Sequence, residues 1–176
     1  MTLLHTERLT LTPVSHTDFD DLVHMWADPE VTRYISGQPM PAEDVWLRLL
    51  RDIGHWQVLG FGNWVIRDEA QSLVGSVGLF DYRRALSPPF SAPEVGWALM
   101  PDFHGKGMAR EAVGAALHHA DTVLDFERTQ CMISVPNTPS IKLAEALGFR
   151  HYAQGLYKGS TLGLYERQRP PAKSAG

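Results

Sequence analysis

The sequence predicts a single α/β (α+β) domain with a mixed central sheet of about seven strands and helices on both faces of the sheet. Three observations predict this fold class. The chain has 176 residues, of which 44% are apolar, and this suits one domain with its own hydrophobic core. Segments with the two-residue period of strands alternate with segments of helical period. In the second half, a strand–helix–strand–helix succession indicates a parallel pair of strands, whereas the first half is more antiparallel in character.

The first half opens with a strand and two helices. The strand is expected over residues 8–14, where apolar side chains alternate. Ser15 precedes Asp18 by three residues, which is a capping signal, and the helix that follows is expected to end near Pro29. A second helix starts near Pro41. Its apolar face is expected to comprise Trp46, Leu49, Leu50 and Ile53.

Three strands come next. The patterns at residues 61–67, 73–80 and 94–100 predict them, and a loop with three prolines, residues 84–93, separates the last two. In the third of these strands, alternation places one set of side chains on a common face. That set is Glu94, Gly96, Ala98 and Met100.

The clearest helix spans residues 108–124, where a stripe of mostly small side chains suits packing flat on a sheet. The stripe comprises Met108, Ala112, Ala116, Ala120 and Val123. A strand over residues 129–135 leads to a short helix, which Asn137 is expected to cap and Gly148 to end.

Two closing strands, residues 149–157 and 160–167, join through a hairpin-like turn at Lys158-Gly159. One domain is therefore expected over residues 1–168. A flexible tail is expected over residues 169–176.

Composition and charge exclude several classes of protein. No apolar run reaches the roughly 18 residues of a membrane span, and the first residues do not resemble a signal peptide. The single cysteine, Cys131, cannot form an internal disulfide, which favours a cytoplasmic protein, and its place in a strand indicates a buried thiol. The net charge of −4 argues against a nucleic-acid-binding surface. No group of His, Cys and Asp has zinc spacing, so no metal is expected.

The segment from Glu94 to Glu111 carries the chemistry. A strand ends, Gly105 and Gly107 occupy the turn, and a helix begins near Met108. Glycines let the main chain approach a ligand closely, and the unpaired N–H groups of a first helical turn bind phosphate. A P-loop is excluded by the residues after the last glycine, and a dinucleotide fingerprint by the missing third glycine. A G-x-G pair on its own is more often only a tight turn.

The context of the two glycines resembles the acyl-CoA signature of the GNAT (GCN5-related) N-acetyltransferase superfamily, R/Q-x-x-G-x-G/A. Here it reads His104-Gly105-Lys106-Gly107-Met108-Ala109, with His104 in place of the usual Arg or Gln. Three further motifs resemble the branch that includes the ribosomal-protein alanine and serine N-acetyltransferases. These are Thr6-Glu7-Arg8-Leu9-x-Leu11, Glu94-Val95-Gly96-Trp97, and Asn137-x-x-Ser140 followed by Leu147-Gly148-Phe149. The match covers residues 6–167.

The resemblance implies the GNAT acyl-CoA acyltransferase fold and acetyl-CoA as co-substrate. In that fold the fourth and fifth strands splay apart around the pantetheine arm, which the main chain of Leu99 and Met100 is expected to bind. The diphosphate is expected on the amides of the glycine turn, where Lys106 and Arg110 add positive charge. The expected ligands around the diphosphate are His104, Gly105, Lys106, Gly107, Met108, Ala109 and Arg110.

Two of the expected co-substrate ligands have alternative roles. Asn137 is expected to contact the pantetheine arm, to cap its helix, or to do both, since the two roles are compatible. His104 either contacts the phosphates, which would make the affinity depend on pH, or is a solvated loop histidine.

Two catalytic residues are expected from the resemblance. Glu94 is the candidate general base, acting through water, and the alternative is a carboxylate held in an ion pair. Ser140 lies where the ribosomal-protein branch is thought to use a serine near the CoA sulfur, and the alternative is a residue that only satisfies main-chain groups. The tyrosine that many relatives use as an acid is absent, because Ala144 takes its position. Tyr152 and Tyr157 are weaker candidates and are expected to be packing residues.

The implied function is transfer of an acetyl group from acetyl-CoA to a primary amine by direct attack within a ternary complex. The alternatives are a catalytically inactive CoA-binding sensor or interaction module, and an interaction domain without a ligand. A peptide N-terminus fits the branch, while a free amino acid, an aminoglycoside or a polyamine stays open. The net charge of −4 slightly favours a cationic acceptor. No nucleic acid or membrane partner is expected, and the protein is expected to be a monomer or a homodimer.

Overall fold

The computed structural model describes residues 1–171 of the chain. Its strands are β1 (Leu4–His5), β2 (Leu9–Pro13), β3 (Asn63–Asp68), β4 (Leu73–Phe80), β5 (Glu94–Leu99), β6 (Arg128–Ser134), β7 (Arg150–Tyr157) and β8 (Ser160–Gln168). Its α-helices are α1 (Phe19–Ala27), α2 (Pro29–Thr32), α3 (Ala42–Leu59), α4 (Met108–Thr122) and α5 (Thr138–Ala146). Two short 3₁₀ helices, His16–Asp18 and Pro101–Phe103, precede α1 and α4. The sequence did not predict β1 and α2, because two and four residues are too few to show a period.

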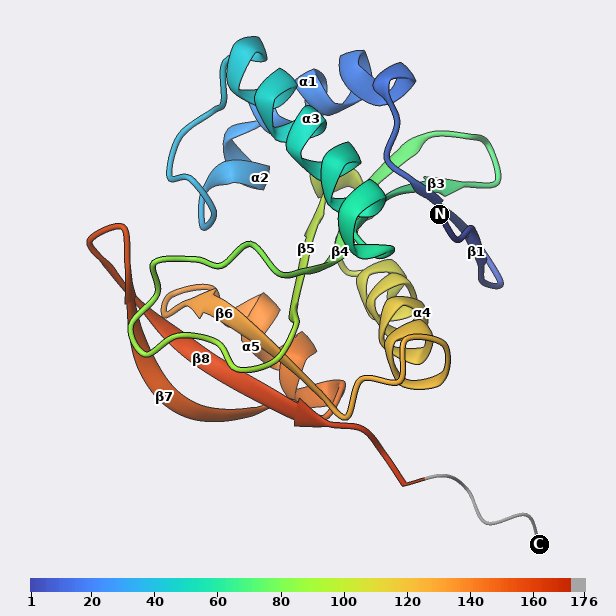
Figure 1. Ribbon diagram of the computed structural model, residues 1–176. Helices are drawn as coiled ribbons and strands as arrows, with labels where there is room; N and C mark the ends of the chain where they lie inside the picture. The colour runs from blue at the N-terminus through green and yellow to red at the C-terminus, as the bar shows by residue number, and fades with distance from the viewer. Residues whose placement is uncertain (172–176) are drawn as a thin grey trace, which may run out of the picture.

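The strands form one sheet in the order β1-β2-β3-β4-β5-β6-β8-β7 (Figure 1). All neighbouring strands are antiparallel except β5 and β6, which are parallel. The expected mixed sheet is therefore confirmed, with eight strands in place of about seven.

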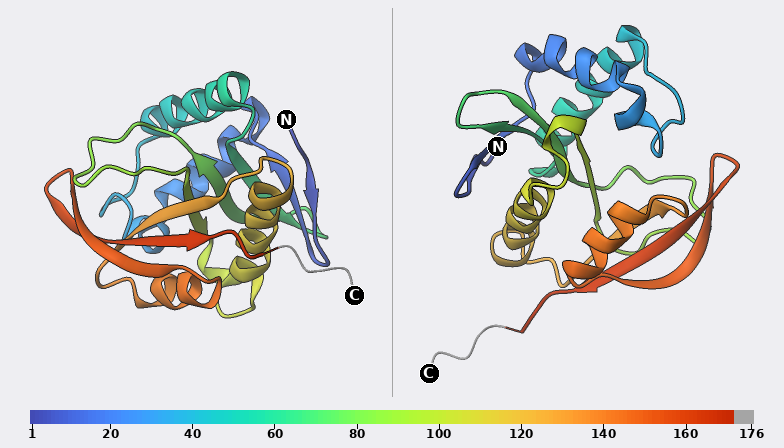
Figure 2. Two further views of the ribbon diagram at one scale, coloured as in Figure 1. Left: turned by 60° about the horizontal axis from the view of Figure 1, so that its bottom comes forward. Right: turned by 180° about the vertical axis from the view of Figure 1, so that it is seen from behind.

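The helices cover both faces of the sheet, as expected. Asn63 on β3 donates its side-chain N–H to Asp52 of α3 at 3.2 Å. The next residue, Trp64, points to the opposite face, where its ring meets His119 of α4 edge-on with 5.7 Å between centroids. Figure 2 shows α1 and α3 together and α4 apart from them, with strands between the two groups.

Several local predictions are confirmed. The strand at residues 73–80 has the predicted bounds. The side chain of Asn137 accepts a hydrogen bond from the main-chain N–H of Ser140 at 3.3 Å, which caps α5. Lys158 and Gly159 both have positive φ, +48° and +80°, as a two-residue hairpin turn with right-handed strand twist requires.

The predicted apolar face of α3 is partly wrong. Leu49 is buried as expected, but Trp46 and Leu50 are 40% and 47% exposed. The helix is rotated because Asp52 points inward to its partner Asn63. A pattern of apolar residues cannot show that a polar residue lies on the buried face. The buried side chains of α3 are Val45, Leu49, Asp52, His55 and Trp56.

The small-residue stripe of α4 is confirmed over most of its length. Ala112, Ala116 and Ala120 are fully buried against the sheet. Val123 is 65% exposed, because the helix ends at Thr122 and not at residue 124.

The expected tail begins with an ordered residue. The main-chain N–H of Arg169 donates to the carbonyl of Glu127 at 2.9 Å, and its guanidinium donates to the carbonyl of Asp121 at 3.1 Å. The same guanidinium pairs with Asp125. Residues 172–176 of the expected tail lie outside the described residues. Within residues 1–171, no helix has the length and apolar content needed to cross a bilayer.

Candidate functional site

The sheet opens where the parallel pair of strands, β5 and β6, begins. β5 and β6 are in register at one position, where Glu94 stands opposite Gln130, and the N–H of Gln130 donates to the carbonyl of Pro93 at 2.9 Å. Beyond this point the two strands diverge (Figure 1). The splay that the resemblance implied between its fourth and fifth strands is therefore present here between β5 and β6.

A cavity of about 580 Å³ fills the gap between the diverging strands. One end is lined by both strands and by the start of α5, where Asn137 and Ser140 lie. The other end is lined by Trp26, by the segment at residues 33–40, and by α3 and β4. A cavity of this form can hold an extended ligand along the strands and a second ligand under α3.

The main chain of β5 offers hydrogen-bonding groups to the cavity side at alternate residues. Met100 has both of its groups engaged elsewhere, because its N–H donates to Val74 at 2.9 Å and its carbonyl accepts from Phe103 at 3.0 Å. Since successive residues of a strand direct these groups to opposite sides, Trp97 and Leu99 direct theirs toward β6. The strand thus directs the groups of Trp97 and Leu99 toward the gap, although the Leu99 carbonyl already accepts one hydrogen bond from His104 at 3.0 Å. Binding of a pantetheine arm by Leu99 and Met100 stays a prediction.

The glycine turn has the conformation that its residues predict. Gly105 and Gly107 have φ of +71° and +78°, which side chains other than glycine rarely adopt, and Gly107 is the N-cap of α4. The main-chain N–H groups of Met108, Ala109 and Arg110 have no carbonyl four residues before them within the helix. Such a helix N-terminus favours an anion, and a diphosphate at this position stays a prediction.

His104 is exposed in its loop, and its contact with phosphates stays a prediction. Its ring Nε2 lies 3.0 Å from the carbonyl oxygen of Leu99, so this nitrogen carries the hydrogen and donates it. The ring therefore links the glycine turn to the end of β5.

A clamp from the N-terminus fixes the glycine turn. The clamp consists of Thr6, Arg8 and Glu111. Thr6 donates its hydroxyl to Glu111 at 2.6 Å, and Arg8 donates its main-chain N–H at 2.9 Å and its guanidinium at 2.6–2.8 Å to the same carboxylate. Arg8 also donates to the carbonyl of Lys106 at 3.0 Å. Burial alone would raise the pKa of Glu111, but the hydrogen bonds from Thr6 and Arg8 outweigh it and lower the pKa.

The sequence placed Thr6 and Arg8 in a family motif without assigning them a task. Their role is to bind Glu111. This role depends on the contact between the N-terminal segment and α4, which the order of residues in the chain does not show. An acidic residue in the first turn of α4, Glu111, is the one local signal.

Asn137 and Ser140 both line the cavity and are half-buried. The carbonyl oxygen of the Asn137 side chain serves as the cap of α5, which confirms one of its two expected roles. Its amide nitrogen is not used by that bond. Contact of Asn137 with a pantetheine arm, and of Ser140 with a sulfur, therefore stays a prediction.

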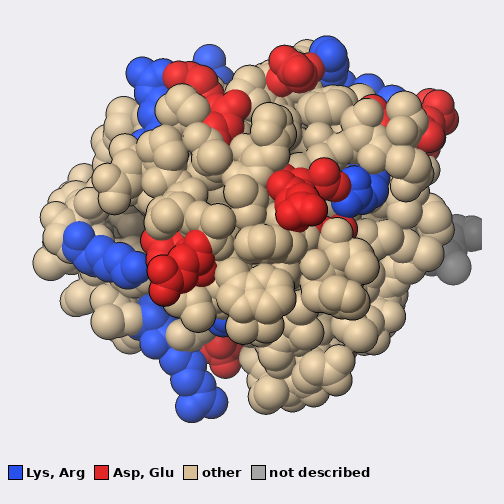
Figure 3. Space-filling model, turned by 90° about the horizontal axis from the view of Figure 1, so that it is seen from above, with Lys and Arg blue, Asp and Glu red and all other residues tan. Residues whose placement is uncertain are grey.

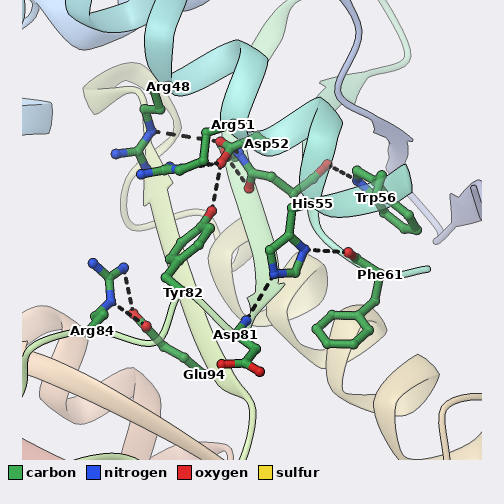
Figure 4. Close-up of polar contacts among 12 residues, drawn as sticks. Arg48, Arg51, Asp52, His55, Trp56, Phe61, Asp81, Tyr82, Arg84 and Glu94 are labelled. Carbon is green, nitrogen blue, oxygen red and sulfur yellow. Dashed lines mark hydrogen bonds and ion pairs between the residues drawn. The ribbon is translucent and has the colours of Figure 1, made fainter. Parts of the chain in front are cut away.

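Glu94 lines the cavity and is held by Arg84 (Figure 4). Arg84 donates to the two carboxylate oxygens at 2.6 and 3.1 Å, and it donates to the hydroxyl of Tyr157 at 3.0 Å. Burial alone would lower the pKa of Arg84, but the hydrogen bond and the charge of Glu94 outweigh it and raise the pKa. The ion pair considered for Glu94 thus exists, and Tyr157 belongs to the same group. Tyr152 lies elsewhere and accepts from Gln130 at 3.1 Å.

A second cluster of polar side chains surrounds Asp52 of α3 (Figure 4). Asp52 accepts hydrogen bonds from Arg51 at 2.8 and 2.9 Å, from Tyr82 at 2.7 Å and from Asn63 at 3.2 Å. Arg48 reaches the same carboxylate only at 4.0 Å. Burial, and then the charge of Asp52, raises the pKa of the Tyr82 hydroxyl, so this group remains a donor at neutral pH.

No sequence pattern marks Arg48, Arg51 or Arg84 as residues of the site. The first two lie on a helix where arginines are expected at the surface, and Arg84 lies in a proline-rich loop. They line the cavity because the fold brings them close to β4 and β5.

Within residues 1–171, no three His, Cys, Asp or Glu side chains are grouped so that they could hold a metal ion. Cys131 lies in β6 and is buried, as expected, and burial raises the pKa of its thiol.

Comparison with known proteins gives a consistent result. The family model of the acetyltransferase (GNAT) domain matches residues 8–150. An uncharacterized N-acetyltransferase of Bacillus licheniformis, p20, is 32% identical over 152 residues, which cover 85% of this chain and 83% of p20. A GNAT-family acetyltransferase structure from Bordetella pertussis is 31% identical, covers 95% of this chain and 99% of its own, and superimposes with a TM-score of 0.83. The ribosomal-protein-S5-alanine acetyltransferase of Vibrio fischeri, 19% identical with a TM-score of 0.77 over 98% of this chain and all of its own, shares the fold.

Proposed function

Because the chain belongs to the GNAT family of acetyltransferases, we propose that it transfers the acetyl group of acetyl-CoA directly to a primary amine bound in the same cavity. The acceptor is a peptide N-terminus or a small-molecule amine. The single observation that carries this proposal is the opening between β5 and β6, which continues into a cavity with room for two ligands.

The two ends of the opening suit the two parts of coenzyme A. A pantetheine arm contains two amide groups, and these can pair with both main-chain groups of Trp97 and with the N–H of Leu99, because the Leu99 carbonyl accepts from His104. A diphosphate suits the glycine turn, where the amides at Met108, Ala109 and Arg110 provide donors and the helix dipole favours negative charge. His104 stabilises the turn through its bond to Leu99.

The proposed reaction requires few groups. The lone pair of the amine attacks the thioester carbonyl, the new C–N bond forms, the C–S bond breaks, and the electron pair leaves with the sulfur. A main-chain N–H of β5 directed toward β6 stabilises the negative charge on the carbonyl oxygen. The departing thiolate takes a proton from water or from the hydroxyl of Ser140, which lines the cavity.

Glu94 is proposed to receive the proton of the amine through a water molecule. Each oxygen of its carboxylate accepts one hydrogen bond from Arg84, and each retains a lone pair that can accept from water. Arg84 therefore orients the carboxylate without closing it off. Tyr157 steadies Arg84 from the other side.

Acetyl-CoA titration combined with release of the CoA thiol tests the proposal. The purified chain is titrated with acetyl-CoA by calorimetry and then assayed with peptides, amino acids, amino sugars and polyamines. We expect binding and thiol release that depends on one class of amine. Binding of acetyl-CoA without turnover of any amine would instead support a CoA-binding sensor module. Absence of binding would overturn both the acetyltransferase and the sensor hypothesis.

A further inference from the structure

The cavity carries an excess of positive charge. Among residues 1–171, five cationic residues line it, and Glu94 is the only acidic residue that does. The cationic residues are Arg33, Arg48, Arg51, Arg84 and Lys158. This contrasts with the chain as a whole, whose net charge is −4. The outer face over α1 and α3 shows no such excess, since acidic and basic side chains are interspersed there (Figure 3).

Three of the five cations already have carboxylate partners. Arg84 is paired with Glu94, and Arg51 with Asp52 through two hydrogen bonds. Arg33 has Glu30 at 3.5 Å on the surface of α2. These pairs cancel most of the charge that the residues bring.

Among Arg48, Arg51 and Arg84, Arg48 is the one without a carboxylate of the described chain at hydrogen-bond distance. Its nearest carboxylate, Asp52, lies at 4.0 Å and already accepts from three other side chains. The Nε atom of Arg48 is buried and has no hydrogen-bond partner within residues 1–171. Its guanidinium stacks on the Trp26 ring, with 4.1 Å to the centroid, so its direction is fixed.

A guanidinium held in this way is suited to a carboxylate. Its planar N–H groups match the two oxygens of a carboxylate, and a guanidinium whose neighbouring carboxylate lies at 4.0 Å, beyond hydrogen-bond distance, gains from a partner that can bond to it. Burial lowers the pKa of Arg48, the charge of Asp52 opposes this change, and the charge of Arg51 adds to it. An arginine nevertheless stays protonated at neutral pH, so the cavity presents a permanent cation under α3.

We propose that the acceptor amine carries a carboxylate, as an amino acid does, and that Arg48 binds this carboxylate and so positions the amine. This inference rests on the proposed acetyltransferase function and specifies its substrate class. It reverses the expectation of a cationic acceptor, which came from the net charge of −4. Charges in the cavity act on a ligand over a few ångströms, whereas salt screens the distant surface charges. Polyamines are repelled from such a cavity.

The test compares pairs of amines that differ only in the carboxylate. Each amino acid is assayed against its own amide, with spermidine as a polycation and short peptides with acidic and neutral side chains in the second position. We expect kcat/KM to be at least about tenfold higher for the acid than for its amide, the effect of one charge-assisted hydrogen bond. Equal rates for acids and amides, or a preference for spermidine, would overturn the inference and leave the acetyltransferase function intact. A preference confined to acidic peptides would identify a peptide N-terminus as the source of the carboxylate.

Arg48→Met and Arg48→Lys test the residue itself. The methionine keeps an unbranched apolar side chain next to Trp26 and removes the charge, and the lysine keeps the charge without the planar fork. We expect the methionine to reduce the acid-to-amide ratio to within about threefold and the lysine to restore part of it. Arg150→Met, which removes an exposed cation of β7 outside the cavity, is the matched control and should leave the ratio unchanged. Equal loss on acids and amides in Arg48→Met would contradict the proposal.

A binding measurement separates this inference from the reaction. N-acetylglycine and its amide are titrated into the protein saturated with CoA. Tighter binding of the acid, lost in Arg48→Met, supports the carboxylate site even where no amine is turned over. Equal binding of the two compounds contradicts it.

Discussion

Glu94 and Arg84 form an ion pair in the lining of the cavity, where their side chains are only 7% and 19% exposed. Removal of one partner from a pair so enclosed costs a few kcal/mol, because the other charge is left without compensation. Replacement of both partners by neutral groups is much less costly. The catalytic and structural roles of Glu94 can be separated on this basis.

We expect Glu94→Gln to lower kcat by about 100-fold, the usual contribution of a general base, and also to lower stability. The double variant Glu94→Gln/Arg84→Met should regain most of the stability while kcat stays low. Steady-state kinetics and thermal denaturation of both variants provide the check. A double variant that recovers wild-type kcat would show that Glu94 is structural only.

Gly107 and Gly114 both belong to α4 or its cap, but only Gly107 has a positive φ, so the pair can test what that φ costs another residue. We expect Gly107→Ala to lose about 1–2 kcal/mol, since φ is +78° there, and to weaken acetyl-CoA binding because the turn must distort. Gly114→Ala, in the middle of α4 with open space around it, should gain about 0.5–1 kcal/mol and leave binding unchanged. Denaturant unfolding and CoA titration measure both. Equal stability of the two variants would refute the strain argument.

Single residues differ in how well their sequence reveals them. The sequence predicts the glycine turn, the Asn137 cap and a cavity place for Glu94, because each depends on local geometry or on the alternation of one strand. It does not reveal Arg48 or Asp52, because their roles depend on contacts between α3 and the sheet. The inward rotation of α3 follows from those polar contacts and not from its apolar spacing.

At the scale of elements, the clamp of Thr6, Arg8 and Glu111 couples the N-terminal segment to the start of α4. We expect Glu111→Gln to raise the KM for acetyl-CoA several-fold with little change in kcat, because the clamp orients the turn and takes no part in the reaction. It should also lower stability by about 1.5 kcal/mol, the value of a charged hydrogen bond. Initial rates over a range of acetyl-CoA concentrations provide the test, and an unchanged KM would disprove the coupling.

The lowered pKa of Glu111 sets the direction of a pH effect. A carboxyl group whose pKa is lower in the folded state stabilises the fold at neutral pH and loses that contribution as pH falls through the folded-state pKa, below 4.5. The difference in stability between wild type and Glu111→Gln should therefore shrink in acid.

Most element boundaries followed from local signals, and the exceptions have a physical reason. Helix caps and hairpin turns require particular residues, so α5 and the β7–β8 hairpin were predictable. β1 and α2 depend on pairing and packing with distant segments and leave no periodic pattern.

For the whole molecule, we expect His119 to make the free energy of unfolding depend on pH. It is 3% exposed between α4 and Trp64, and its Nε2 has no hydrogen-bond partner within residues 1–171. Burial, and to a lesser degree the charge of His118, lowers its pKa below 6.5.

Because the unfolded state binds this proton more readily, the free energy of unfolding should fall as pH drops below about 6.5. His119→Phe should flatten that part of the pH dependence, while His118→Phe, on the exposed side of the same helix, should not. Urea unfolding from pH 7.5 to 5 measures the difference. The same slope in wild type and His119→Phe would exclude His119 as the cause.

The single register position shared by β5 and β6 divides the eight strands into two hydrogen-bonded groups, β1–β5 and β6–β8. Along the gap each group presents an interior edge whose donors and acceptors lack a strand partner. A pantetheine arm seated there would supply the missing rungs of the ladder. The donor molecule would then act as a temporary strand, and each release of CoA would return the sheet to two loosely joined halves.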